Sequence, residues 1–181
     1  DAIAPLLDLA RAPLSPAGAT TAVFYTISNC QRGLAGISFG NFLIKQVVEE
    51  LKRELPRLTT FVTLSPVPGF AQWLTEQRKA PHSSYIPPAD VAVLNELDDP
   101  AWPTSPRLSE MEGAIMAAAA AYFLRAKTSR GKPIDPVARF HLGNGARLER
   151  INFLGDTSTK GLRQSYGVMV NYLYDLPNIE S

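Results

Sequence analysis

Residues 21–70 read TAVFYTISNCQRGLAGISFGNFLIKQVVEELKRELPRLTTFVTLSPVPGF, and this stretch decides the fold. Residues 22–27 and 60–64 are rich in β-branched and aromatic side chains, which are typical of strands. Between them, residues 42–55 carry apolar side chains along one helix face, and Pro56 stops that helix. The order strand, glycine-bearing segment, helix, strand predicts a βαβ-like unit whose two strands are parallel neighbours.

The flanking segments add helices and a loop. Residues 2–10 predict a short helix, and residues 78–106 contain many prolines and predict a loop or insertion over one edge. A helix is predicted from Ser109, which has capping-box spacing to Glu112, through an alanine tract to about Ala126. This places one long helix between the βαβ-like unit and the last third of the chain.

The last third of the chain is predicted to be mostly β. Strand-like composition occurs in three segments: residues 137–142, 147–154 and 168–174. The third segment also fits a helix, because its period is ambiguous over so short a run. The sequence therefore predicts one α/β domain over residues 1–181.

Composition and charge exclude several kinds of partner. The chain has 18 basic and 17 acidic residues, whereas a protein that binds nucleic acid through phosphates usually carries a clear basic excess. Its apolar stretch at residues 114–124 is too short to span a bilayer. The single cysteine, Cys30, cannot form an internal disulfide and fits a reducing compartment. We therefore expect neither a nucleic-acid nor a membrane partner.

Three glycines, Gly33, Gly36 and Gly40, lie between the first predicted strand and the helix that follows it. Such a loop exposes backbone N–H groups at a helix N-terminus, which attracts phosphate or pyrophosphate. The alternative is that the glycines only shape a turn, and spacing alone leaves both readings open. The loop matches neither the Rossmann fingerprint nor the Walker A pattern. Coenzyme A, held as on an acetyltransferase loop, is therefore a candidate ligand.

Ser65 and His141 are the candidates for chemistry. Ser65 ends a predicted strand before a Pro-x-Pro-Gly turn, where functional side chains often lie, although such a serine is more often a turn residue. Its context is not the nucleophile elbow of hydrolases. His141 lies in a predicted strand, where a lone histidine is more often structural, but few other groups supply general acid catalysis near neutral pH. His82 is expected to be exposed, and two distant histidines with one cysteine predict no metal site.

Five motifs, taken together, resemble the malonyl-CoA decarboxylase family. They are FYTIS at residues 24–28, QRGLAGISFGNFLIK at 31–45, LSPVPGF at 64–70, DPVARFHLGNGA at 135–146 and SYGVMVNYLY at 165–174. They occur in the expected order and span nearly the whole chain. No single motif would be as specific as the set.

The resemblance implies a fold similar to the GNAT acyltransferases, with a mixed sheet flanked by helices and coenzyme A on the loop before a helix. It implies that Ser65 and His141 are catalytic and that Tyr174 lies at the substrate. The implied substrate-binding residues of the loop are Ala35, Gly36, Ile37, Ser38, Phe39, Gly40 and Asn41. The family's helical N-terminal domain and the first strands of the fold have no counterpart in this sequence. We therefore expect the chain to be the C-terminal catalytic part of a longer protein.

The activity that the resemblance implies is decarboxylation of malonyl-CoA to acetyl-CoA and CO2, through a thioester enolate that a dyad of Ser65 and His141 protonates. The thioester is itself the electron sink, so no metal or cofactor is expected, and coenzyme A is part of the substrate. The family assembles through its helical N-terminal domain, which implies a homo-oligomer. A composition rich in Ala, Pro and Arg favours the bacterial cytoplasm over the mitochondria or peroxisomes of a eukaryote.

Two other functions stay open at the level of sequence. A GNAT-type acyltransferase that passes the acetyl group of acetyl-CoA to an amine would share the coenzyme site. It would leave the motifs around Ser65 and His141 unexplained. A non-catalytic acyl-CoA-binding or assembly module would bind coenzyme A without turnover.

Overall fold

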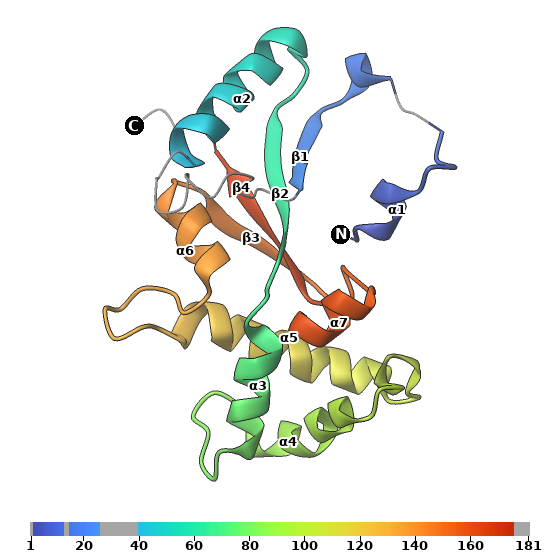
Figure 1. Ribbon diagram of the computed structural model, residues 1–181, viewed down its shortest axis with the longest axis vertical. Coiled ribbons are helices and arrows are strands. Elements are labelled where there is room, and N and C mark those ends of the chain that lie inside the picture. The colour runs from blue at the N-terminus through green and yellow to red at the C-terminus, as the bar shows by residue number, and fades with distance from the viewer. Residues whose placement is uncertain (1, 13–14, 26–39, 176–181) are drawn as a thin grey trace.

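The computed structural model of this chain describes residues 2–12, 15–25 and 40–175 (Figure 1). Its elements in chain order are α1 (Ala4–Leu7), η1 (Pro16–Gly18), β1 (Thr21–Tyr25), α2 (Gly40–Glu54), β2 (Thr60–Pro66), α3 (Phe70–Lys79), α4 (Pro88–Leu94), η3 (Asn95–Asp98), η4 (Trp102–Thr104), α5 (Leu108–Arg125), α6 (Pro136–Gly143), β3 (Arg147–Asn152), α7 (Thr159–Ser165) and β4 (Met169–Tyr174). The helix predicted for residues 2–10 is therefore limited to the short α1.

The described strands form one mixed sheet in the order β1-β2-β4-β3. β1 pairs in parallel with β2, with Val23 opposite Val62, whereas β4 runs antiparallel to both β2 and β3. The parallel pairing predicted for the first two strands is thus confirmed. The ambiguous segment at residues 168–174 forms a strand, and this strand lies beside β2 in the middle of the sheet.

Helices lie at both ends of this sheet. Figure 1 shows α2 at one end, while α3, α4 and α5 gather at the other. A large cluster of buried side chains joins the sheet to these helices, and it includes Phe61 of β2, Phe70 of α3, Leu94 of α4 and Ile115 of α5. This shared core makes the described residues one α/β unit, as the sequence predicts.

Residues 78–106, predicted to be a loop or insertion, contain helical segments. They contain α4, η3 and η4, and Leu94, Leu97 and Trp102 are buried in the core. Pro88 occupies the first turn of α4, where the missing N–H of a proline needs no partner. Prolines therefore stand in the first turns of α4 and η4, so some of the prolines in this segment mark the beginnings of helices.

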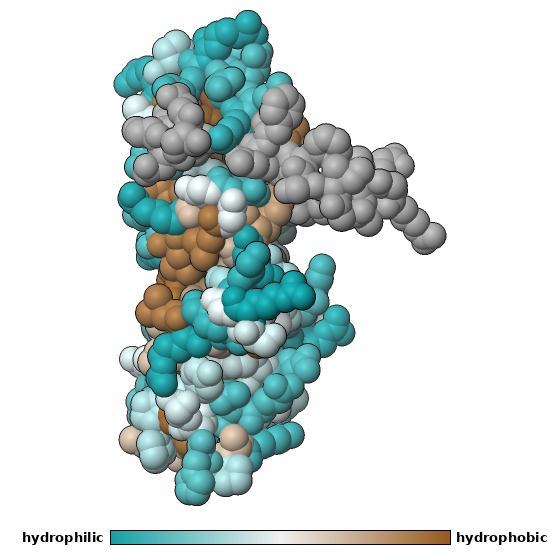
Figure 2. Space-filling view, turned by 90° about the vertical axis from the view of Figure 1, so that its left-hand side faces the viewer, coloured by the Kyte–Doolittle hydropathy of each residue, from teal (hydrophilic) through white to brown (hydrophobic). Residues whose placement is uncertain are grey.

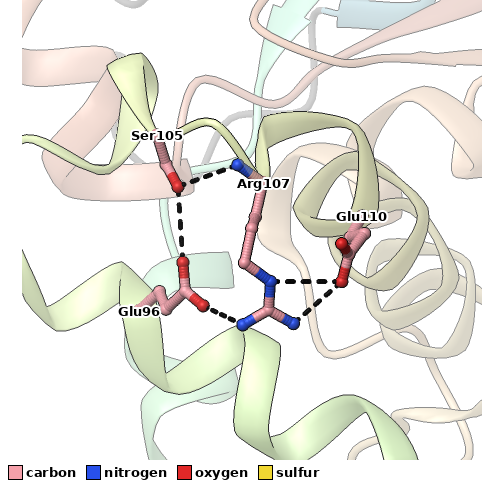
Figure 3. A network of polar contacts seen from close by, with 4 residues as sticks. All are labelled: Glu96, Ser105, Arg107 and Glu110. Carbon is pink, nitrogen blue, oxygen red and sulfur yellow. Dashed lines mark hydrogen bonds and ion pairs between the residues drawn. The ribbon is translucent and has the colours of Figure 1, made fainter.

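The long helix α5 lacks the predicted capping box of Ser109 and Glu112. Ser109 already lies inside its first turn, and no side chain caps the helix at its start. Arg107 instead lies between Glu96 and Glu110 and binds both carboxylates (Figure 3). These ion pairs connect η3 to the first turn of α5.

Residues 137–142 form part of a helix rather than the predicted strand. The carboxylate of Asp135 accepts a hydrogen bond from the backbone N–H of Ala138 at 2.7 Å, and Pro136 opens α6. A capping side chain and a proline in the first turn are strong helix-start signals, and they outweigh the strand-like composition. His141 therefore lies in the last turn of a helix.

The surface carries both polar and apolar regions. Figure 2 views the side that bears α6 and shows hydrophobic side chains gathered at mid-height, with hydrophilic side chains above and below. Ile134 and Leu142, beside and within α6, are among the exposed apolar side chains. Among the described residues, no helix combines the length and apolar character that crossing a membrane requires.

Candidate active site

Ser65 lies near the end of β2, and its residue is only 5% exposed. Thr63, two positions earlier, shares the same face of the strand because successive side chains alternate between faces. The Ser65 hydroxyl donates a hydrogen bond to Thr63 Oγ1 at 2.9 Å. The strand and this bond together fix the position of the serine oxygen.

His141 packs against the central strand β4. Its imidazole stacks on the ring of Tyr172, with centroids 4.5 Å apart and planes 22° apart. Phe140 and Tyr174 meet the imidazole edge-on. The residue is 3% exposed, so this aromatic packing fixes the plane of the ring.

These two residues meet inside the protein. Ser65 Oγ lies 3.4 Å from Nε2 of His141, and the other ring nitrogen, Nδ1, lies 2.7 Å from the hydroxyl of Tyr174. Tyr174 comes from β4, where it pairs with Phe61 of β2. Thr63, Ser65, His141 and Tyr174 thus form one chain of polar contacts built from β2, α6 and β4.

Burial decides the protonation states of the His141 imidazole and the Tyr174 phenol. It lowers the pKa of His141 to about 4, so the imidazole is neutral near pH 7 and carries one N–H. Burial also raises the pKa of Tyr174 above its ordinary value, so the phenol keeps its proton. The phenol can donate to Nδ1 when the N–H lies on Nε2, facing Ser65, and can accept from Nδ1 in the other tautomer, so a second contact must select between the two.

A buried carboxyl group anchors the helix that carries His141. Asp135 is 1% exposed, caps α6 through one oxygen and accepts a hydrogen bond from the Tyr122 hydroxyl at 3.4 Å through the other. Burial raises the pKa of Asp135, although its hydrogen bonds from Ala138 and Tyr122 act in the opposite direction. The pair of Asp135 and Pro136 before a helix is the sequence signal that could have identified this anchor.

A cavity of about 610 Å³ opens beside Ser65 and His141. Lys160 and Gln164 of α7 line it, and Met169 of β4 adds apolar surface. Both charged and apolar groups therefore surround the space next to the serine and the histidine. Such a mixed lining suits a small polar group carried on a larger molecule.

The structure brings together three of the residues that the sequence singles out: Ser65, His141 and Tyr174. Sequence reasoning does not find Thr63 or Tyr172, which contact the same group. Both are ordinary strand residues by composition, and only the pairing of β2 with β4 brings them to the site.

The other predicted site residues belong to the segment before and at the start of α2. Residues 35–39 and Cys30 lie outside the described residues. Gly40 and Asn41 form the first turn of α2, of which only the backbone is described. His82 is exposed, as predicted. Within residues 2–12, 15–25 and 40–175, no group of three or more His, Cys, Asp or Glu side chains could hold a metal ion.

Comparison with protein families gives one match over the whole chain. The family model described as malonyl-CoA decarboxylase C-terminal domain matches residues 1–181. Among curated proteins, the mitochondrial malonyl-CoA decarboxylase of Anser anser anser is 39% identical over 180 residues, which are 90% of this chain and 36% of that protein. The enzyme of the same name from Rattus norvegicus is 39% identical over 174 residues, 86% of this chain and 35% of its own length.

Solved structures of bacterial proteins agree with these matches. The malonyl-CoA decarboxylase of Rhodopseudomonas palustris aligns with a TM-score of 0.93 at 62% identity, over 99% of this chain and 41% of its own. That of Agrobacterium vitis aligns with a TM-score of 0.92 at 58% identity, over 99% of this chain and 44% of its own. The chain thus spans less than half the length of each of these relatives.

Proposed function

The chain belongs to the malonyl-CoA decarboxylase family, and we propose on that basis that it forms the catalytic part of an enzyme that converts malonyl-CoA to acetyl-CoA and CO2. The observation that carries the proposal is the contact of Ser65 Oγ with His141 Nε2, 3.4 Å apart at the wall of a cavity. Two buried polar groups at a cavity wall can act on the same part of a substrate.

The reaction sets clear demands on such a site. When the malonyl carboxylate leaves as CO2, the electrons of the broken C–C bond pass into the thioester as an enolate. Hydrogen-bond donors aimed at the thioester oxygen stabilise this growing negative charge. A proton must then reach the α-carbon to form the methyl group of acetyl-CoA. Because the thioester accepts the electrons, we propose that the reaction needs neither a metal nor a further cofactor.

We assign these tasks to the dyad. His141 supplies the proton, and Ser65 positions or polarises the malonyl group; in a variant of this scheme, Ser65 relays the proton from His141 to carbon. The free site holds a neutral imidazole, but a bound malonyl carboxylate favours the protonated ring, because an opposite charge within about 4–6 Å raises the pKa of a histidine. The proton that His141 takes up when malonyl-CoA binds is the one that later reaches the α-carbon of acetyl-CoA.

The structure supports a role for Tyr174 beside the substrate contact that family resemblance implies. The resemblance places it at the substrate, whereas its hydroxyl lies 2.7 Å from His141 Nδ1. This contact supports a role in orienting the imidazole, as the partner of the second ring nitrogen commonly does. We therefore propose Tyr174 as a positioning residue for His141.

The coenzyme part of the substrate requires a phosphate site. We propose that residues 35–41 bind it, because α2 begins within this segment, at Gly40, and has no acidic residue in its first turn. Backbone N–H groups and the positive end of the helix dipole favour phosphate at such a place. Lys160, which lines the cavity, is a further cation that could meet a negatively charged group of the substrate.

The proposal extends to the compartment and the assembly of the complete protein. The relatives with solved structures are bacterial and more similar than the mitochondrial ones, which supports the bacterial cytoplasm. We also propose that the complete protein assembles into a homo-oligomer, as the family resemblance implies.

The test is to supply the complete protein with malonyl-CoA and to measure CO2 and acetyl-CoA together. We expect equal amounts of both products, strong loss of turnover in a folded Ser65→Ala variant, and normal turnover in His82→Asn, which alters an exposed histidine elsewhere. Release of no CO2 by a protein that binds coenzyme A would contradict the proposal. Consumption of acetyl-CoA only in the presence of an amine would favour an acyltransferase instead.

A further inference from the structure

Thr63 occupies an interruption in the sheet directly beside the site. Backbone pairing of β2 with β4 runs through Val62 and Leu173 and appears again at Ser65 and Val170. Between these pairs, the side chain of Thr63 stands in for the backbone: its Oγ1 accepts a hydrogen bond from the N–H of Tyr172 at 3.1 Å.

The other neighbour of β4 is irregular at the same level. The pairing of β3 with β4 shifts register between Leu148 and Arg150, opposite Tyr172 and Asn171. The side-chain amide of Asn171 donates to the backbone oxygen of Thr63 at 2.7 Å. Sheet irregularities of this kind occur often next to active sites, where they redirect side chains. Here the hydroxyl and the backbone oxygen of Thr63 are both bonded to β4, so the threonine has a fixed position.

A hydroxyl group has one proton to donate, and this sets the direction of the whole chain of bonds. The Ser65 hydroxyl donates to Thr63 Oγ1 at 2.9 Å, so it has no proton left for His141. Its oxygen then faces Nε2 of His141 as an acceptor at 3.4 Å. Nδ1 accepts from Tyr174 at the other side of the ring.

We propose that Thr63 is a positioning residue for the decarboxylation: by accepting the hydrogen bond of the Ser65 hydroxyl, it holds His141 as the tautomer with its N–H on Nε2. This inference rests on the proposed function for its catalytic meaning. In this tautomer the Nε2–H of His141 is a donor that points towards Ser65 at the cavity wall before substrate binds. Without the acceptor on Thr63, the Ser65 proton is free to turn to Nε2, and the ring then carries its proton on Nδ1.

A purely structural role for Thr63 makes a different prediction. In that role the threonine only satisfies the N–H of Tyr172, so its removal lowers stability without changing the state of His141. Nitrogen-15 NMR of the imidazole distinguishes the two roles, because protonated and unprotonated ring nitrogens have well-separated shifts. The spectrum reports the tautomer whether or not the protein turns over malonyl-CoA.

The experiment compares Thr63→Val and Thr63→Ser in the complete protein at pH 7, with the His141 signals assigned by their loss in His141→Asn. We expect the Nε2–H tautomer in the parent and in Thr63→Ser, which keeps the oxygen, and a shift towards Nδ1–H in Thr63→Val. Thr75→Val is the matched control, since it removes a part-buried hydroxyl from α3 that bonds Ala71 and Tyr166. It should leave the tautomer unchanged. Should Thr63→Val fail to fold, Thr63→Cys, with a weaker acceptor of similar size, takes its place.

Turnover gives a second reading. We expect kcat of Thr63→Val to fall about tenfold with KM nearly unchanged, as loss of one hydrogen bond in the transition state would give, and Thr63→Ser to stay within about twofold of the parent. An unaltered tautomer in Thr63→Val, or equal losses in Thr63→Val and Thr63→Ser, would overturn the proposal. A parent that releases no CO2 would refute the proposed function, while the tautomer measurement would still decide the role of Thr63.

Discussion

Ser65 and His141 are separated by 76 positions in the sequence, yet Oγ of the serine lies 3.4 Å from Nε2 of the histidine. One comes from the end of a central strand and the other from the last turn of a short helix. Their meeting depends on the pairing of β2 with β4, whose aromatic side chains support the imidazole. The consequences of this arrangement can be measured on stability and on turnover.

The buried histidine makes stability depend on pH. The pKa of His141 is about 4 in the folded protein against 6.5 in the unfolded chain, so only the unfolded chain binds a proton here between these values. The free energy of unfolding should therefore fall as the pH drops from about 7 to 4, by up to about 3 kcal/mol from this residue. Urea unfolding across this range should show a steeper loss in the parent than in His141→Asn. The same pH dependence of the unfolding free energy in the two proteins would contradict a lowered pKa of His141.

Tyr174 and Tyr172 form a matched pair for testing the hydrogen bond to His141 Nδ1. The Tyr174 hydroxyl bonds Nδ1, whereas the buried Tyr172 hydroxyl has no hydrogen-bond partner among the described atoms. Tyr174→Phe should lower kcat about tenfold, because one hydrogen bond to the catalytic ring is lost, and Tyr172→Phe should change it little. Steady-state kinetics with malonyl-CoA decides the matter. A rise in KM with unchanged kcat in Tyr174→Phe would instead indicate that this residue binds substrate.

Substitution of Gly161 tests how tightly α7 packs at the wall of the cavity. A Cβ at this position would lie 2.4 Å from Cγ and 2.5 Å from the backbone oxygen of Asp156, so Gly161→Ala must displace the start of α7. We expect the unfolding free energy to fall by about 1–3 kcal/mol, the usual cost of overpacking. Gly113→Ala is the control: nothing lies within 4 Å of its Cβ in the helix α5, and it should stabilise by about 0.5–1 kcal/mol. Equal effects of the two substitutions in thermal unfolding would count against the packing at α7.

The sequence predicts the central part of this fold because its signals there are local. β-branched and aromatic composition identifies β1 and β2, a helical period identifies α2, and the parallel pairing follows from their order. At α6, composition misleads, because six strand-like residues are outweighed by the cap that Asp135 provides. The candidate pair was found through family resemblance; composition alone favoured structural roles for both residues. Thr63 gave no signal, since its function depends on the interruption between β2 and β4, which only the folded sheet contains.

The central claim is that Ser65 and His141 act as one unit, and a double-mutant cycle tests it most directly. Turnover of malonyl-CoA should be measured for the complete protein, for Ser65→Ala, for His141→Asn and for the double variant, each verified as folded. We predict that each single substitution lowers kcat/KM by about 10²–10⁴-fold and that the double variant loses no more than the poorer single one. Losses that multiply in the double variant would show that the two residues act independently and would contradict the dyad.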